Sequence, residues 1–203
     1  MVRLLCCDIS ALGREEYEAL LALAGPERRT RAERCRRMED GLRCLAAEAL
    51  LRRALPGADL SRLAREPGGK PCLPGVCFNL SHSGPWVALA LGQSTLGVDV
   101  ETPRPGRKVE ALTRRYFSLR EQAFVLAPET GREDRFLQVW TGKESWLKYL
   151  GTGLDRPLGT VCTFADGLPP LHRWPLPGGG WICLCTREVP PEAPEWVAAA
   201  ELL

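Results

Sequence analysis

The feature that most constrains the fold is a break near the middle of the chain. The run Thr102-Pro103-Arg104-Pro105-Gly106 holds two prolines and a glycine, residues that interrupt helices and strands. It separates residues 1–102 from residues 103–203 in a chain of 203 residues. A chain of this length suits one substantial domain or two small ones with a shared core, and the break is the natural boundary between two halves of similar size.

Each half is predicted to combine helices with a few short strands. In the first half, hydrophobic periodicity and turn residues predict strands at 2–8, 76–80, 85–91 and 96–101, and helices at 14–24, 27–36 and 40–55. In the second half they predict helices at 108–116 and 134–150, a helix start at the capping box of Ser118 and Glu121, a turn at 175–180, and strands at 159–165 and 181–187. Strands and helices are grouped rather than alternating, so we expect an α+β fold with helices packed on small antiparallel sheets.

Two carboxylates, Asp99 and Glu101, lie on one side of the predicted strand 96–101. Side chains alternate along a strand, so these two point to one face while the valines between and before them point to the other. A hard divalent cation such as Mg²⁺ relieves the repulsion of two such charges and shares its coordination with phosphates. The pattern alone is also common at a solvated strand end.

The predicted helix 134–150 carries a second charged group. Glu144 and Lys148 lie one turn apart at the border of its apolar face. As an ordinary surface pair they would contribute only ~0.2–0.5 kcal/mol. Lys143 falls inside the apolar face, so its ammonium group must either reach solvent or meet an anion.

Ser81 and His82 end a predicted strand, just before the turn at Gly84-Pro85. Both side chains can donate hydrogen bonds to a phosphate, although a lone histidine is more often structural. Adjacent strand residues point apart, so His82 cannot readily activate Ser81, and a Gly-x-Ser-x-Gly motif is missing. A serine hydrolase is therefore not supported. An ATPase and a dinucleotide-binding protein are not supported either, because their glycine-rich motifs are not present. Asn79 is expected to fix the turn.

The composition excludes several further classes of protein. The net charge of +2 is no nucleic-acid signature, and no apolar run approaches the roughly 20 residues that span a bilayer. The first apolar stretch is too short for a secretory signal, so we expect a cytoplasmic protein. The nine cysteines are odd in number and form no Cys-x-x-Cys pair, so we expect free thiols.

Several blocks, taken in order, resemble a known family. They are Gly69-Lys70-Pro71, Phe78-Asn79-Leu80-Ser81-His82-Ser83, Gly97-Val98-Asp99-Val100-Glu101 and Trp140-x-x-Lys143-Glu144-Ser145-x-x-Lys148-x-x-Gly151-x-Gly153-Leu154. The set resembles the 4'-phosphopantetheinyl transferases of the surfactin-synthetase-activating (Sfp) type, from the arginine-rich N-terminal segment to the C-terminus. The resemblance implies a pseudo-dimeric monomer of two similar halves with coenzyme A bound between them. It also implies transfer of 4'-phosphopantetheine to a serine of an apo acyl or peptidyl carrier protein, with release of adenosine 3',5'-bisphosphate.

The resemblance further implies roles for individual residues. Asp99, Glu101 and Glu144 would ligate Mg²⁺. Glu144, or a water that it positions, would take the proton from the carrier serine, and Lys148 would neutralise or protonate the leaving phosphate. The contacts to coenzyme A would come from Arg28, Arg31, Arg43, Lys70, Ser81, His82, Asp99 and Lys148.

Two other functions stay open at the level of the sequence. One is a non-catalytic module that binds coenzyme A or a carrier protein, and the other is a different Mg²⁺-dependent phosphotransferase. Under the family reading, we expect the segment 105–128 to contact the carrier protein. The sequence does not indicate which carrier proteins are modified.

Overall fold

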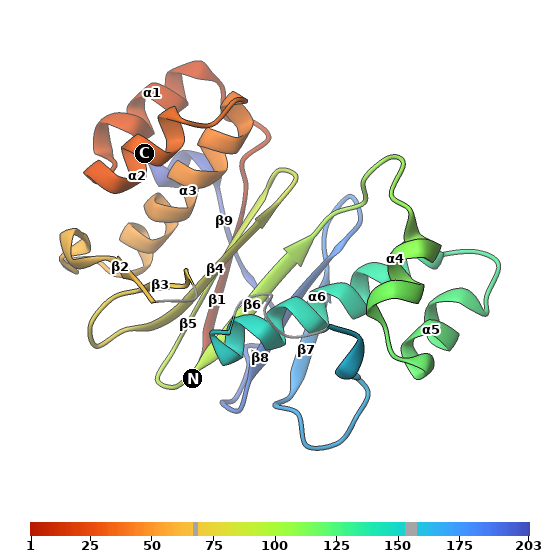
Figure 1. Ribbon diagram of the computed structural model, residues 1–203. Coiled ribbons are helices and arrows are strands. Elements are labelled where there is room, and N and C mark those ends of the chain that lie inside the picture. Colours follow the sequence, from red (N-terminus) through yellow and green to blue (C-terminus); the bar gives the residue numbers. More distant parts are fainter. Residues whose placement is uncertain (67–68, 153–157) are drawn as a thin grey trace.

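The computed structural model describes residues 1–66, 69–152 and 158–203. Two sheets lie side by side, with the N-terminal helices against one and a long helix across the other (Figure 1). The α+β class predicted from the sequence is confirmed. Within the described ranges, no helix is both long and apolar enough to cross a membrane.

The first sheet has the strand order β4-β5-β1-β9. Its strands are β1 (Arg3–Asp8), β4 (Cys77–Ser83), β5 (Trp86–Gly92) and β9 (Glu195–Val197). The pairs β1–β5 and β4–β5 are antiparallel, as predicted, whereas β9 runs parallel to β1. The C-terminal strand therefore joins the sheet of the first half. A division at residues 102 and 103 stays a prediction.

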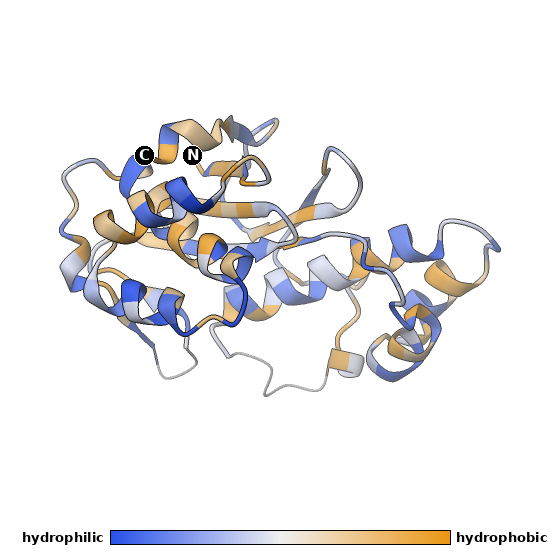
Figure 2. Ribbon diagram, turned by 90° about the horizontal axis from the view of Figure 1, so that it is seen from above, coloured by the Kyte–Doolittle hydropathy of each residue, from blue (hydrophilic) through white to orange (hydrophobic). Residues whose placement is uncertain are grey.

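Three helices pack around this first sheet. They are α1 (Arg14–Leu23), α2 (Pro26–Glu33) and α3 (Met38–Ala54). Helix α3 is buried along most of its length, and its leucines and alanines form one core with the apolar residues of β1 and β5. In the helices at the left of Figure 2, hydrophilic and hydrophobic residues are interspersed.

The second sheet has the order β6-β8-β7 and is antiparallel throughout. Its strands are β6 (Leu96–Glu101), β7 (Leu171–Pro175) and β8 (Trp181–Thr186), and α6 (Arg132–Leu150) packs on β6 and β8. The approach of α6 to β6 is close at Gly97, where an added Cβ would overlap the backbone atoms Ser145 O and Tyr149 N. Only glycine permits this packing.

Helices α4 (Val109–Tyr116) and α5 (Leu119–Leu126) lie beside the N-terminal part of α6 (Figure 1). The predicted capping box at the start of α5 is present, because the Ser118 hydroxyl accepts a hydrogen bond from the Glu121 N–H and the Glu121 carboxylate accepts one from the Ser118 N–H. Phe117 stacks on Phe136 of α6 with ring centroids 5.2 Å apart. This apolar contact joins the two short helices to α6.

The strand predicted at 159–165 is wrong. That segment forms the short 3₁₀ helix η3 (Leu158–Thr160) and turns, and β7 is the strand that pairs with β8. In this segment the Val161 carbonyl accepts from buried Lys143 of α6 and the Thr163 N–H donates to buried Glu121 of α5, so these backbone groups are not available to a sheet. The predicted turn at 175–180 is confirmed, with Leu176 N donating to Gly180 O at 3.0 Å.

Besides η3, β7 and β9, four further short elements of the described residues were not predicted. They are the hairpin of β2 (Ala64–Arg65) with β3 (Pro71–Cys72), and the 3₁₀ helices η1 (Leu60–Arg62) and η4 (Ala199–Leu202). Helix α6 ends at Gly151 in the left-handed conformation, as predicted. Gly153 and Leu154, which complete the last family-like block, lie outside the described residues.

Candidate active site

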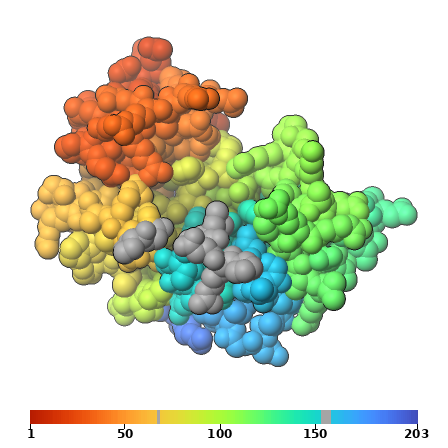
Figure 3. All heavy atoms as spheres, in the orientation of Figure 1, coloured from red at the N-terminus to blue at the C-terminus, as the bar shows by residue number. Residues whose placement is uncertain are grey.

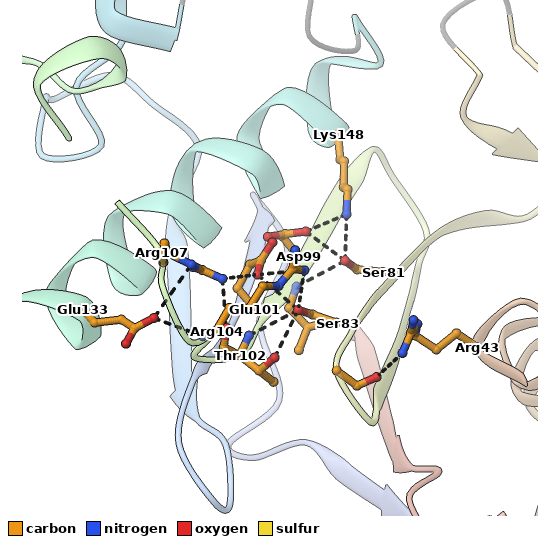
Figure 4. Close-up of polar contacts among 12 residues, drawn as sticks. Arg43, Ser81, Ser83, Asp99, Glu101, Thr102, Arg104, Arg107, Glu133 and Lys148 are labelled. Carbon is orange, nitrogen blue, oxygen red and sulfur yellow. Dashed lines mark hydrogen bonds and ion pairs between the residues drawn. The ribbon is translucent and has the colours of Figure 1, made fainter. Parts of the chain in front are cut away.

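Three elements bring Lys148, Asp99 and Ser81 into mutual contact. Lys148 Nζ, on α6, donates to Asp99 Oδ1 of β6 at 2.7 Å and to Ser81 Oγ of β4 at 2.8 Å. The Ser81 hydroxyl in turn donates to Asp99 Oδ1 at 2.8 Å. Figure 4 shows the resulting triangle of an ammonium, a carboxylate and a hydroxyl. Three distant sequence blocks therefore meet at one point.

The Asp99 side chain is buried and has one unsatisfied oxygen. Among the residues that the structure describes, its Oδ2 atom has no hydrogen-bond partner, although Oδ1 has two. A buried polar atom without a partner costs ~1–3 kcal/mol, so native proteins rarely leave one without a reason. A cation at this oxygen would supply the missing interaction.

Glu144 lies close enough to Asp99, Glu101 and Lys148 to feel their charges. Burial of Glu144 and the negative charge of Asp99 raise its pKa to about 7; Lys148 partly offsets this rise and Glu101 adds to it. The carboxylates of Asp99, Glu101 and Glu144 thus carry more negative charge than the single ammonium group of Lys148 can compensate. This excess of negative charge and the raised pKa of Glu144 both fit a divalent cation among these carboxylates.

The Glu101 carboxylate is already bound by other side chains of the protein. Its Oε2 atom accepts hydrogen bonds from the Ser83 hydroxyl at 3.1 Å and from Arg107 Nη2 at 3.3 Å, and it lies 3.5 Å from Arg104 Nη2 (Figure 4). As the sequence predicts, Asp99 and Glu101 both lie opposite the buried valines of β6. In the part of the chain that the structure describes, no three acidic, histidine or cysteine side chains already stand as a metal-binding group.

Positive charges gather around His82. Its exposed side chain lies on the face of β4 opposite to that of Ser81, as alternation along a strand predicts, whereas Ser81 itself is buried. Desolvation and the charges of Lys148, Arg43 and Arg31 lower the pKa of His82 to about 4. Figure 3 shows a hollow between the N-terminal helices, in orange, and the segment after β6, in green; its floor has the yellow-green colour of residues near β4 and β5. This face has the charge that suits an anion.

Arg28 and Lys70 are directed at other protein groups. Arg28 is only 5% exposed and pairs with buried Glu48, whose Oε2 lies 3.5 Å from Arg28 Nε. Lys70 Nζ donates to the carbonyls of Leu96 at 3.1 Å and Lys148 at 2.9 Å. The contacts to coenzyme A expected of these two residues stay predictions.

A fully buried ion pair lies behind the site. Lys143 and Glu121 are both 0% exposed, and Lys143 Nζ lies 2.8 Å from Glu121 Oε2. Lys143 also donates to the carbonyls of Leu158 and Val161. Glu121 accepts from the N–H and the hydroxyl of Thr163 at 2.7 and 2.9 Å. Of the two alternatives that the sequence left for Lys143, solvent or an anion, the structure shows an anion, and it is Glu121, the capping residue of α5.

The sequence reasoning missed the roles of Asn79 and Ser83. Asn79 was expected to fix the turn, but its Oδ1 atom accepts the N–H of Val98 on β6 at 2.8 Å. Ser83 contacts Glu101 as described above. The available signal was their spacing: with Ser81 they place a polar residue at every second position of a buried strand.

Comparisons with known proteins agree on one family. A family model described as the 4'-phosphopantetheinyl transferase superfamily matches residues 95–177. The 4'-phosphopantetheinyl transferase Sfp of Bacillus subtilis strain 168 is 35% identical over 157 residues, which are 72% of this chain and 69% of that protein. The 4'-phosphopantetheinyl transferase psf-1 of Bacillus pumilus is 34% identical over 157 residues, 72% of this chain and 66% of that protein. The 4'-phosphopantetheinyl transferase HetI of a Nostoc species is 31% identical over 158 residues, 70% and 65% of the two chains.

Proposed function

Because this chain belongs to the 4'-phosphopantetheinyl transferase superfamily, we propose that it transfers 4'-phosphopantetheine from coenzyme A to a serine hydroxyl of an acyl or peptidyl carrier protein. The other product would be adenosine 3',5'-bisphosphate. The observation that carries the proposal is the contact of Lys148 with Asp99 and Ser81, at 2.7 and 2.8 Å, beside a carboxylate whose pKa is raised to about 7. Phosphoryl-type transfer depends mainly on this kind of positioned, compensating charge.

The metal of this site would be Mg²⁺, held by Asp99, Glu101 and Glu144. The unsatisfied Asp99 Oδ2 atom and the raised pKa of Glu144 support this assignment. When bound, the ion would neutralise charge on the pyrophosphate of coenzyme A.

Glu144 and Lys148 would handle protons and charge. With a pKa of about 7, a substantial fraction of Glu144 is ionised at neutral pH, so it can accept the proton of the carrier serine directly or through a water. The Lys148 ammonium is held by two acceptors in a fixed position. It would neutralise, or donate a proton to, the phosphate that leaves with the adenosine nucleotide.

Arg31, Arg43 and His82 would hold the phosphates of coenzyme A. The positive charges of Arg31 and Arg43 already act on His82 across the face formed by α2, α3 and β4, and with a pKa of about 4 the His82 imidazole is neutral at pH 7 and can donate its ring N–H. Arg43 is fixed by Gly84 O, to which its Nη1 atom donates at 2.8 Å, and by an ion pair with Asp40. An arginine held in this way presents a preorganised fork to phosphate oxygens.

Ser81 is a weaker candidate for a phosphate contact. A hydroxyl offers one donor and two acceptor positions. Ser81 Oγ already donates to Asp99 Oδ1 and accepts from Lys148 Nζ and Val100 N. A direct contact with coenzyme A would require one of these bonds to break.

The carrier protein would dock on α4 and α5. Leu119 is 83% exposed and Phe124 is 37% exposed, and Arg115 and Arg120 are exposed beside them. An exposed apolar residue bordered by arginines fits a partner with an acidic, partly apolar surface. We also propose that the protein is a monomer and that it is cytoplasmic. The free state of all nine cysteines supports the second proposal, because disulfides are rare in a reducing compartment.

A direct experiment is incubation with coenzyme A, Mg²⁺ and a panel of apo carrier proteins. We expect the mass of at least one carrier to rise by one phosphopantetheine group, and adenosine 3',5'-bisphosphate to form in equal amount. The Glu144→Gln variant, which removes a charge without changing shape, should show no transfer. Binding of coenzyme A without any gain in carrier mass would instead indicate a non-catalytic binding module. Phosphoryl transfer to a small molecule without release of adenosine bisphosphate would indicate a different phosphotransferase.

A further inference from the structure

Strands β4 and β6 lie at the edges of two different sheets, yet they are in contact along their length. No backbone pairing joins them in the described part of the chain. An edge strand directs the N–H and C=O groups of every second residue away from its sheet, and buried groups of this kind need partners. On β6 the outward groups belong to Leu96, Val98 and Val100, and the series continues at Thr102.

Side chains of β4 supply the partners for this edge. Val98 N donates to Asn79 Oδ1 at 2.8 Å, Val100 N to Ser81 Oγ at 3.2 Å, and Thr102 N to Ser83 Oγ at 3.3 Å. Lys70 Nζ completes the series by donating to Leu96 O at 3.1 Å. We call the contacts of Asn79, Ser81 and Ser83 with β6 the side-chain ladder.

The two serines of the ladder repeat one set of contacts. Ser81 donates to the Asp99 carboxylate and accepts from a cation, Lys148. Ser83 donates to the Glu101 carboxylate at 3.1 Å and likewise accepts from a cation, Arg104, at 3.2 Å. Each serine therefore fixes a backbone N–H and the carboxylate of the preceding residue at the same time (Figure 4).

We propose that Asn79 and Ser83 are positioning residues of the transferase: through the side-chain ladder they fix the register of β6, and with it the direction of Asp99 and Glu101, against the strand that carries Ser81 and His82. The inference rests on the proposed function. Both residues are buried, at 3% and 2% exposure, so neither touches the substrate directly. If β6 moved along β4 by one contact of the ladder, here called one rung, the carboxylates of Asp99 and Glu101 would be displaced from Lys148. Displacements of about 1 Å can reduce turnover by about 100-fold.

The test uses Ser83→Ala, which removes one rung and one carboxylate contact, and Asn79→Leu, which removes one rung alone. The matched control is Thr186→Val, because the Thr186 hydroxyl is also buried and also accepts a backbone N–H, that of Glu188 at 3.1 Å, but lies at the end of β8 away from the residues paired with Asp99 and Glu101. We expect a fall in kcat of at least about tenfold for Ser83→Ala, a smaller fall for Asn79→Leu, and none for the control. The Mg²⁺ concentration for half-maximal rate should rise for Ser83→Ala, while the KM for coenzyme A stays within about threefold of wild type.

Hydrogen exchange measured on single amides provides a readout that does not depend on activity. In the wild-type protein the amides of Val98, Val100 and Thr102 should be protected although they have no backbone partner. Ser83→Ala should lose protection at Thr102 first, and Asn79→Leu at Val98 first. Unprotected amides in the wild type would overturn the ladder, even if a variant fails to fold. Lost protection with unchanged kcat and Mg²⁺ requirement would overturn the positioning role. A wild-type protein that modifies no carrier but protects these amides would overturn the proposed function, and with it the positioning role, but not the ladder.

Discussion

Replacing Lys143 by methionine should destabilise the protein strongly, because it removes one half of a buried ion pair. The Lys143 ammonium group is 0% exposed and uses its three donors on Glu121 Oε2, Leu158 O and Val161 O. Methionine has a similar length and fills the same space without a charge. The substitution therefore isolates the loss of the ion pair from the loss of packing.

The magnitude follows from what the substitution leaves behind. Glu121 is 0% exposed, so its carboxylate would lose its compensating cation without gaining water. Breaking a buried pair in this way costs ~3–5 kcal/mol. Domains of this kind are stable by only about 5–15 kcal/mol in total. We expect the free energy of unfolding of Lys143→Met to be lower by about 4 kcal/mol.

Urea unfolding followed by fluorescence of the six tryptophans measures this change. The companion variant is Lys143→Met with Glu121→Gln, which removes the orphaned charge but keeps a hydrogen-bonding group at the α5 cap. We expect the double variant to recover about 1–2 kcal/mol relative to Lys143→Met, because residues in contact couple in a double-mutant cycle. A loss below about 1 kcal/mol for the single variant, or strict additivity in the cycle, would refute the reasoning.

The sign of the pH dependence gives a second check. Burial alone would raise the pKa of Glu121, but the hydrogen bond and charge of Lys143 and the N–H groups of Thr163 and Ser118 lower it. A lowered pKa contributes stability above the unfolded value and loses it as the pH falls through the folded value. In Lys143→Met only burial and the N–H groups of Thr163 and Ser118 still act on Glu121, so the pKa of Glu121 should be higher than in the wild type. The difference between the two proteins should be largest near pH 7 and shrink as the pH falls, first through the folded-state pKa of Glu121 in Lys143→Met and then through the lowered pKa of the wild type.

Four further results are expected. Gly97→Ala should lower the free energy of unfolding by about 3 kcal/mol in the same assay, because its methyl group would overlap the α6 backbone; wild-type stability would show that α6 can move away. The rate at low Mg²⁺ should rise with pH through about 7 as Glu144 ionises, and the midpoint should fall at saturating Mg²⁺; a pH-independent rate would contradict this role. The pKa of His82, near 4 in the free protein, should rise when coenzyme A is added, because an anion offsets the surrounding cations; imidazole NMR shifts that do not change would place the phosphates elsewhere. A chelator should abolish transfer and Mg²⁺ should restore it, so a chelator-insensitive reaction would exclude the metal.

Local patterns predicted the elements of the site, since their geometry depends on short-range periodicity. Alternation along β6 placed Asp99 and Glu101 on one face, and helical spacing placed Lys143 inside the apolar face of α6. The sequence could not name Glu121 as the partner of Lys143, because the fold alone brings them together. For the same reason the sequence predicted a strand at 159–165, although Val161 O and Thr163 N of this segment bond to these two side chains.

Long-range contacts also separate residues that the sequence makes equivalent. Arg28 and Arg31 lie one turn apart on α2, but Arg28 is 5% exposed while Arg31 is exposed. The difference comes from Glu48 on α3, which lies 3.5 Å from Arg28 Nε. Strand β9 was missed because three residues are too short to show a period, and its pairing with β1 joins opposite ends of the chain.

Two residues fix the placement of α6, and with it the directions of Glu144 and Lys148. Gly97 sets how deeply α6 packs on β6, because any larger residue would collide with the helix backbone. Lys143 sets the rotation of the helix about its axis, since its ammonium group is bound on three sides. Successive residues of a helix are rotated by about 100°, so fixing Lys143 also fixes the direction of Glu144, and Lys148 follows about 40° further round. Lys143, a buried residue of α6 itself, therefore helps to fix the direction of Glu144 and Lys148, the two residues proposed for catalysis, just as Asp99 of β6 does by contacting Lys148.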